Sequence, residues 1–265
     1  MVWVAAFLWA VAAVLHSAQA DEVAALYQAY WAGMPAGEIR LTLRDDPAAY
    51  RDEIAIRSEG LARLLSRFRA SVVSEGRLPA GLAPAPHRYD AVYDLRKRRD
   101  RRLSMNFVPR AGGPQATGLS GEAVIADRGP PDTSKKPPLA ERFRTNVLDP
   151  LSALAAIRQE LRRGNRGSFT IPVYDGARRF DVQVQVLPKR AGDTVLPLTL
   201  TLAPIAGFKG ESGEDGDPDD SPRPVALTIS DDQRLMPLSM SVSLGYLPLV
   251  VQLSRWCGAT APCPW

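Results

Sequence analysis

The chain has 265 residues, of which 45% are hydrophobic and 23% are charged. This composition excludes a largely disordered protein, and the length suffices for one sizeable hydrophobic core. The formal net charge of +4 is a mild basic excess, which fits an anionic lipid surface as a partner better than nucleic acid.

Residues 1–20 are apolar as far as His16 and end in Ala18, Gln19 and Ala20, the small-x-small pattern of a signal peptidase site. We therefore expect a signal peptide at 1–20, a single β-rich domain at 21–265 and export to the periplasm, where nucleic acid is not a partner. The usual basic residues before the apolar stretch are missing, so an uncleaved N-terminal anchor remains the alternative. No later stretch is long and apolar enough to span a bilayer.

The first half of the mature chain reads mainly as β-strands. A strand from Ala24, a Gly- and Pro-containing turn at 33–37 and an alternating strand at 38–44 predict a hairpin, and further strands are expected near 50–56 and 69–75. Between these two strands, four apolar residues recur at helical spacing and predict a second, short helix. They are Leu61, Leu64, Leu65 and Phe68.

A basic segment at 96–102 is the densest charge cluster and is expected to join two strands as a hairpin tip. A solvated tip is the ordinary interpretation of such a run, and docking on anionic lipid head groups is the functional one. The candidate surface residues are Arg96, Lys97, Arg98, Arg99, Arg101 and Arg102.

Residues 149–161 carry the clearest helix signal. Asp149 is a good N-cap, Pro150 suits the first helical position, and Gly164 after two arginines is a typical end. Its apolar arc predicts contact with a partner surface or a hydrophobic ligand. The arc comprises Leu151, Leu154, Ala155, Ile157 and Leu161, and four of these are candidate ligand-binding residues: Leu151, Leu154, Ile157 and Leu161.

Arg158 falls inside this apolar arc. Its stem can lie along apolar surface while the guanidinium reaches water. Alternatively it is a buried, paired charge that contacts the head group of a ligand. The sequence leaves both interpretations open.

After the helix, four strands show strict alternation of apolar and polar residues, near 180–186, 196–202, 225–229 and 238–244. A sheet with one apolar face and a helix with a wide apolar arc can bury each other. We therefore expect a mainly β fold, a strongly curved antiparallel sheet in the form of a half or open barrel, with the helix on its concave face. Stretches near 109–138 and 209–222 are expected to be flexible. The first contains a predicted short strand in GEAVIA. The second contains an acidic loop at 211–220, which lacks the glycine and glutamate of a calcium loop.

Cys257 and Cys263 are the only cysteines, and in an oxidising compartment they are most simply a disulfide. A thiol redox pair is the alternative, although the spacing is not that of thioredoxin-like motifs. His87 is the only histidine after residue 20, so a multi-histidine metal site is excluded. No nucleophile elbow, phosphate-binding loop or dinucleotide fingerprint is present, and no cofactor is expected. Paired carboxylates remain open as an enzymatic option, but we expect no enzyme.

Several short motifs run through the chain: YWAG at 30–33, AG at 36–37, SEGRL at 74–78, Pro84, Tyr89, DPLSAL at 149–154, IR at 157–158, VYDGAR at 173–178 and SDDQRLMP at 230–237. With these motifs, the sequence resembles the bacterial exported proteins grouped as domain of unknown function 3108. The resemblance implies a periplasmic β-rich protein without an assigned reaction, similar in shape to the periplasmic lipoprotein carriers. The acidic loop and the cysteine-bearing tail depart from the family pattern.

The function expected from the sequence is a non-enzymatic module or carrier that binds a lipid or another hydrophobic ligand during cell-envelope maintenance. The alternative is a structural envelope protein with a filled core, which contacts a protein or peptidoglycan through its surface. An empty apolar concavity would favour the first and a filled one the second.

Overall fold

A computed structural model describes residues 21–79, 82–95, 98–109, 121–129, 139–190, 192–208, 222–244, 247–258 and 263. The expected signal peptide and the acidic loop at 211–220 lie outside the described residues. Within the described part, no helix has the length and apolar character needed to cross a membrane.

Every strand of the described residues belongs to one antiparallel sheet of 13 strands, which curls so strongly that it is nearly closed into a barrel. The predicted fold class is therefore confirmed. The N-terminal strands are β1 (Asp21–Trp31), β2 (Met34–Asp45), β3 (Ala49–Ser58), β4 (Arg69–Arg77), β5 (Ala85–Leu95), β6 (Arg98–Pro109) and β7 (Gly121–Gly129). The C-terminal strands are β8 (Ser168–Tyr174), β9 (Arg179–Val186), β10 (Val195–Ala206), β11 (Arg223–Ser230), β12 (Pro237–Leu244) and β13 (Leu247–Gly258).

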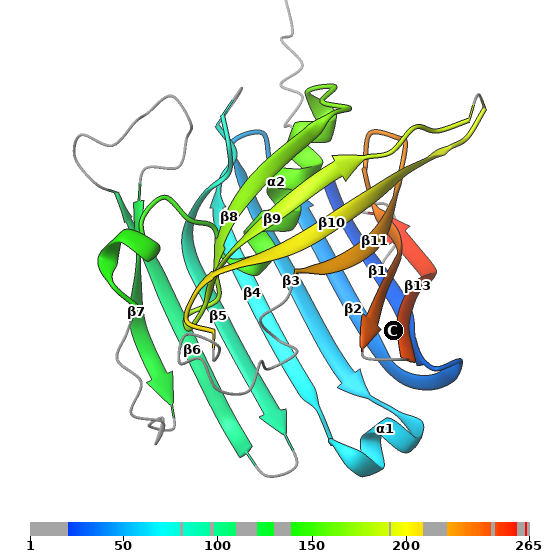
Figure 1. The fold of residues 1–265 in the computed structure, drawn as a ribbon, viewed down its shortest axis with the longest axis horizontal. Coiled ribbons are helices and arrows are strands. Elements are labelled where there is room, and N and C mark those ends of the chain that lie inside the picture. The colour runs from blue at the N-terminus through cyan, green and yellow to red at the C-terminus, as the bar shows by residue number, and fades with distance from the viewer. Residues whose placement is uncertain are drawn as a thin grey trace, which may run out of the picture.

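The strand order is β7-β6-β5-β4-β3-β2-β1-β13-β12-β11-β10-β9-β8. The first and last strands thus pair in the middle of the sheet, with Val23 opposite Gly258 and Trp31 opposite Leu249. The chain between β7 and β8 carries the short 3₁₀ turn η2 (Glu141–Phe143) and the helix α2 (Pro150–Arg162). In Figure 1, β8 to β11 cross in front of the N-terminal strands and α2 lies between these two layers.

A bridging segment, residues 144–148, connects the two edges of the sheet. On the β7 side, the Ala123 amide donates to the Arg144 carbonyl at 2.9 Å and the Asn146 amide donates to the Gly121 carbonyl at 2.8 Å. On the β8 side, the Leu148 carbonyl accepts from the Tyr174 amide, also at 2.8 Å. These bonds satisfy edge groups that would otherwise be free to pair with another chain.

Helix α2 begins and ends as the sequence predicts. Asp149 has an extended backbone and caps the helix, while Gly164 has φ of +81° immediately after its last turn. The buried surface of the helix is wider than the predicted apolar arc, because the sheet surrounds the helix. Ala153 and Ala156, which lie outside that arc, are also buried. Leu154 is only partly buried.

Two hydrophobic clusters lie on either side of α2. The first joins Leu151 to inward residues of the N-terminal strands such as Tyr27, Leu41 and Met105. The second joins the other side of α2 to the C-terminal strands, through residues that include Ile157, Leu161, Ile171, Val184, Leu198 and Ile229.

The second helix, α1 (Gly60–Leu65), is short as predicted and connects β3 to β4. Two expectations about the strands need correction. The stretch 109–138 contains strand β7, which is longer than the predicted GEAVIA strand. Strand β13, which ends just after Cys257, was not predicted from the sequence. In the stretch 109–138, only Pro109 and β7 belong to the described residues.

Candidate functional site

A buried polar cluster surrounds the N-terminus of α2. Asp149 Oδ1 accepts hydrogen bonds from the amides of Leu151 (3.0 Å) and Ser152 (2.9 Å), and its Oδ2 accepts from the Ser74 hydroxyl at 3.0 Å. The Ser152 hydroxyl also donates to Oδ2 and lies 2.5 Å from the Tyr50 hydroxyl. The cluster ties the helix start to β3 and β4, which supply Tyr50 and Ser74.

Burial dominates the electrostatics of this cluster. It raises the pKa of Asp149 and that of Tyr50, against the opposing effect of their hydrogen bonds to serine. Asp149 and Ser152 are both inaccessible to solvent. The Ser–Asp contacts therefore hold the helix in place and offer no exposed nucleophile to a substrate.

Asp52, two residues after Tyr50 and on the same inward face of β3, is a second buried acid. Its side chain is fully buried, and burial raises its pKa to about 7 against the opposing charge of Arg158. Among the described residues, neither carboxylate oxygen accepts a well-formed hydrogen bond, although the backbone of Arg44 helps to lower the pKa. An uncompensated carboxylate at this depth is costly.

Arg158 is buried, with 3% of its side chain exposed, so the snorkelling interpretation is wrong. Its Nη2 lies 2.9 Å from Asp45 Oδ2 and donates to the Arg234 carbonyl at 3.0 Å. Asp45 also contacts Arg162 at 2.5 Å. The guanidinium thus joins α2, the end of β2 and the turn before β12.

The other candidate ligand-binding residues of α2 already contact protein. Leu151 and the partly buried Leu154 belong to the first hydrophobic cluster, while Ile157 and Leu161 belong to the second. In the described part of the chain, the concave face opposite them is thus occupied by side chains. Arg158 and these four residues come together on one helix, and none of them lines the apolar groove beside α2 that is described next.

An apolar groove of about 260 Å³ lies beside α2 at the edge of β8. Sequence reasoning missed it, because its walls come from segments far apart in the chain and only the helix was singled out. The lining residues are Ala83, Pro84, Leu148, Ala156, Glu160, Phe169, Thr170, Ile171 and Pro172. Glu160 is the only charged residue of this set, and its carboxylate is bonded to Arg163 and to the Asn165 amide.

The predicted basic tip is shorter than expected. Strand β6 begins at Arg98, so Arg98, Arg99, Arg101 and Arg102 belong to a strand and not to a turn. Arg102 is exposed and Arg101 is partly buried. Arg96 and Lys97 lie outside the described residues, as do the side chains of Arg98 and Arg99.

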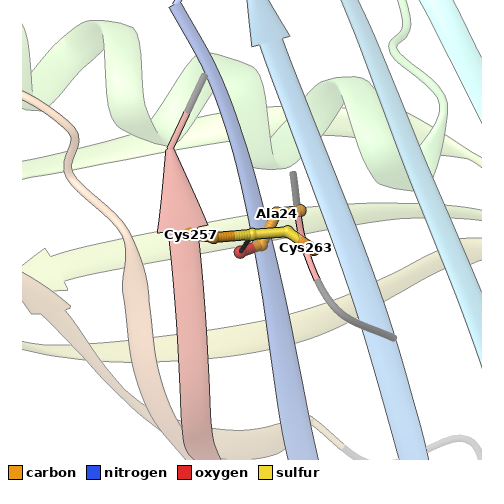
Figure 2. The surroundings of a disulfide bond; sticks show 3 residues. All are labelled: Ala24, Cys257 and Cys263. Atoms are coloured by element: carbon orange, nitrogen blue, oxygen red, sulfur yellow. Dashed lines mark hydrogen bonds between the residues drawn. A yellow bond between two sulfur atoms is a disulfide. The ribbon is translucent and has the colours of Figure 1, made fainter. Parts of the chain in front are cut away.

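The disulfide predicted between Cys257 and Cys263 is present, with Cα atoms 5.9 Å apart (Figure 2). Cys257 lies on β13 opposite Ala24 of β1, whose carbonyl is 3.8 Å from its sulfur. The crosslink therefore fastens the end of the chain over the central β1–β13 pair. No group of three metal-binding side chains occurs among the residues that the structure describes.

Comparison with known proteins gives a family and a fold. The sequence profile of a family described as protein of unknown function (DUF3108) matches residues 26–246. A solved structure, described as a beta-barrel-like protein of domain of unknown function DUF1849 from Brucella abortus, is similar with a TM-score of 0.51 and 11% sequence identity. That similarity covers 91% of this chain and 98% of the other. No curated protein matches.

Proposed function

Because the chain belongs to the DUF3108 family of proteins of unknown function, its activity must be argued from its own surfaces, and we propose that it is a non-enzymatic periplasmic module that binds the acyl chain of a lipid. The observation that carries this proposal is the apolar groove beside α2. The proposed ligand site is this groove between α2 and the edge strand β8. The concave face that the sequence suggested is occupied by side chains.

The groove has the chemistry of an acyl-chain site. Carbon-rich walls from Leu148, Ala156, Phe169 and Ile171 favour an apolar ligand, because apolar contact removes hydrocarbon from water. Ligand pockets for drug-sized molecules span about 300–1,000 Å³, so about 260 Å³ suits one short chain or the end of a longer one. The ion-paired Glu160 at this site leaves no free charge to repel hydrocarbon.

Two features of the chain support a periplasmic setting. The disulfide fits an oxidising compartment, and the apolar first 20 residues fit a signal peptide.

The test is titration with a fluorescent dodecanoate analogue, together with native mass spectrometry of gently purified protein. Thr170 is exposed and lines the groove, so Thr170→Trp should obstruct it and weaken probe binding about tenfold, or roughly 1.4 kcal/mol. Ser168→Trp, exposed on the same strand but outside the groove, is the matched control and should bind normally. No probe binding and no lipid mass on the unmodified protein would contradict the proposal.

A second candidate is a structural envelope protein that acts through protein or peptidoglycan contacts. The two hydrophobic clusters that occupy both sides of α2 favour it, because a rigid, filled scaffold needs no ligand. Crosslinking in intact cells tests it, with a reproducible envelope partner as the supporting result.

A further inference from the structure

One end of the barrel combines clustered arginines with exposed apolar side chains. We call it the α1 end and define it by α1, the β1–β2 turn at Ala32 and Gly33, the end of β5 and the start of β13. The Glu59 amide donates to the Ala36 carbonyl at 2.8 Å, and the Ala32 amide donates to the Pro248 carbonyl at 3.0 Å. Figure 1 shows α1 and the β1–β2 turn along the same lower edge.

A broad cavity of about 910 Å³ opens at this end between α1 and β5. Its lining carries an excess of positive charge, with four arginines against two acids. The lining residues are Arg57, Ser58, Glu59, Arg63, Leu64, Arg67, Phe68, Arg69, Asp94 and Leu95.

The two acids do not neutralise the arginines. Glu59 is paired with Arg57 at 3.2 Å, and Arg57 also contacts Glu38. Asp94 accepts the Asp100 amide at 2.8 Å. Within the described part of the chain, Arg63, Arg67 and Arg69 are exposed and make no ion pair, so three guanidinium groups remain available to an anion.

Exposed apolar side chains lie at the same end of the barrel. Leu64 of α1, which lines the cavity with the arginines, is 65% exposed. Met34 after the β1–β2 turn is 47% exposed, and Leu247 at the start of β13 is 42% exposed. Exposure of one such residue is ordinary, but three at the end that carries the unpaired arginines match an interfacial membrane contact. Cations there meet lipid phosphates while aliphatic side chains enter the acyl boundary.

We propose that the α1 end is a docking surface for an anionic phospholipid bilayer, with Arg63, Arg67 and Arg69 on the lipid phosphates and Leu64, Met34 and Leu247 in the interface. Charge complementarity selects this occupant, because a bilayer offers many phosphates to a broad, open basic cavity and hydrocarbon to the exposed apolar side chains at the same end. The surface shares no residue with the apolar groove beside α2, so docking and acyl-chain binding can be tested independently.

The experiment is flotation of the purified protein with vesicles of phosphatidylcholine alone or of phosphatidylcholine mixed with phosphatidylglycerol. Only the anionic vesicles should carry the protein, and added salt should release it. Arg63→Gln/Arg69→Gln removes two charges at the cavity and should weaken binding about thirtyfold, since each basic residue near the surface contributes about 1 kcal/mol.

The matched control is Arg77→Gln/Arg190→Gln, which removes the same charge from two exposed arginines outside the α1 end. Arg77 closes the same strand that Arg69 opens, and Arg190 lies between β9 and β10. This control should change binding less than twofold. Equal losses in both pairs would overturn the proposal, because they would show attraction by net charge alone.

Leu64→Ser is a second test that leaves every charge in place and alters an exposed side chain. It should weaken binding to anionic vesicles about threefold, roughly the loss of 0.7 kcal/mol of buried hydrocarbon. No change would overturn the insertion of Leu64. Absence of vesicle binding, with binding of soluble glycerol phosphate at the cavity, would overturn docking and assign a small-anion site. Fatty-acid binding in the groove would be unaffected by either result.

Discussion

At the scale of single residues, two buried charges dominate the candidate site. Asp52 is held below the surface with a raised pKa, and Arg158 is held there by Asp45 and a carbonyl. Their effects on stability differ, because one group is poorly compensated and the other is well compensated.

Asp52→Asn should change the pH dependence of stability. A pKa raised from 3.8 to about 7 means that the folded protein binds more protons than the unfolded chain between these pH values. Folding stability contributed by this group is therefore complete below about pH 4 and is lost as pH rises to about 7. Urea unfolding at pH 4, 6 and 8 measures the free energy of unfolding. As the pH rises, this free energy should increase for the variant relative to the parent, by on the order of 2–4 kcal/mol at pH 8.

The exposed Asp46 provides the control for that experiment, because Asp46→Asn removes a carboxylate close in sequence at a site open to solvent. It should leave the pH profile unchanged. Parallel pH profiles for Asp52→Asn and the parent would show that Asp52 is not protonated on folding.

Arg158→Met should destabilise the fold. Removing one partner of a buried pair typically costs about 3–5 kcal/mol, and the remaining contact of Asp45 with Arg162 should limit the loss to about 2 kcal/mol. Arg162→Met, which removes a far more exposed partner of the same carboxylate, should cost under about 1 kcal/mol. Chemical denaturation measures both, and equal losses would contradict the buried-pair argument.

Sequence reasoning reached part of this site. Arg158 was recognised because a charge interrupts an apolar arc. Asp52 carried a similar signal that went unused: it occupies the inward position between Tyr50 and Ile54 in an alternating strand. Asp45 was out of reach, because its contact with Arg158 joins residues 113 positions apart.

At the scale of elements, α2 depends on its N-cap more than most helices, because Asp149 also accepts bonds from two buried hydroxyls. The sequence predicted its start from the Asp-Pro pair and its end from Gly164. It did not predict burial on nearly all sides, since composition at positions such as Ala153 and Ala156 is equally compatible with an exposed helix face.

Asp149→Ala should lower stability by about 3 kcal/mol, from the loss of an N-cap worth about 0.5–2 kcal/mol and the stranding of buried hydroxyls at about 1–3 kcal/mol. Asp149→Asn keeps the oxygen that caps the amides of Leu151 and Ser152, so it should lose less than half as much. Thermal unfolding followed by far-UV circular dichroism separates the two variants. Equal losses would show that the negative charge, and not the cap geometry, holds the helix.

At the scale of the whole molecule, the curved antiparallel sheet was predictable because β9 to β12 alternate strictly between apolar and polar residues. Strand β13 was not, since it contains Pro248 and only one fully buried residue, so it lacks a clear alternating pattern. Closure by the bridging segment was also beyond prediction. Residues 144–148 show no hydrophobic periodicity, and their backbone hydrogen bonds depend on where the two edges of the sheet lie in the fold.

The pairing of β1 with β13 also has a consequence for how the protein is made. During synthesis β1 emerges long before its partner β13 (Leu247–Gly258), because Ala24 and Cys257, which lie opposite each other, are 233 positions apart. The central hydrogen-bonded ladder therefore has the greatest sequence separation in the fold, a feature associated with slow folding. Until β13 is made, one side of β1 remains an open edge that can pair with other strands, so incompletely synthesised copies are prone to associate with one another.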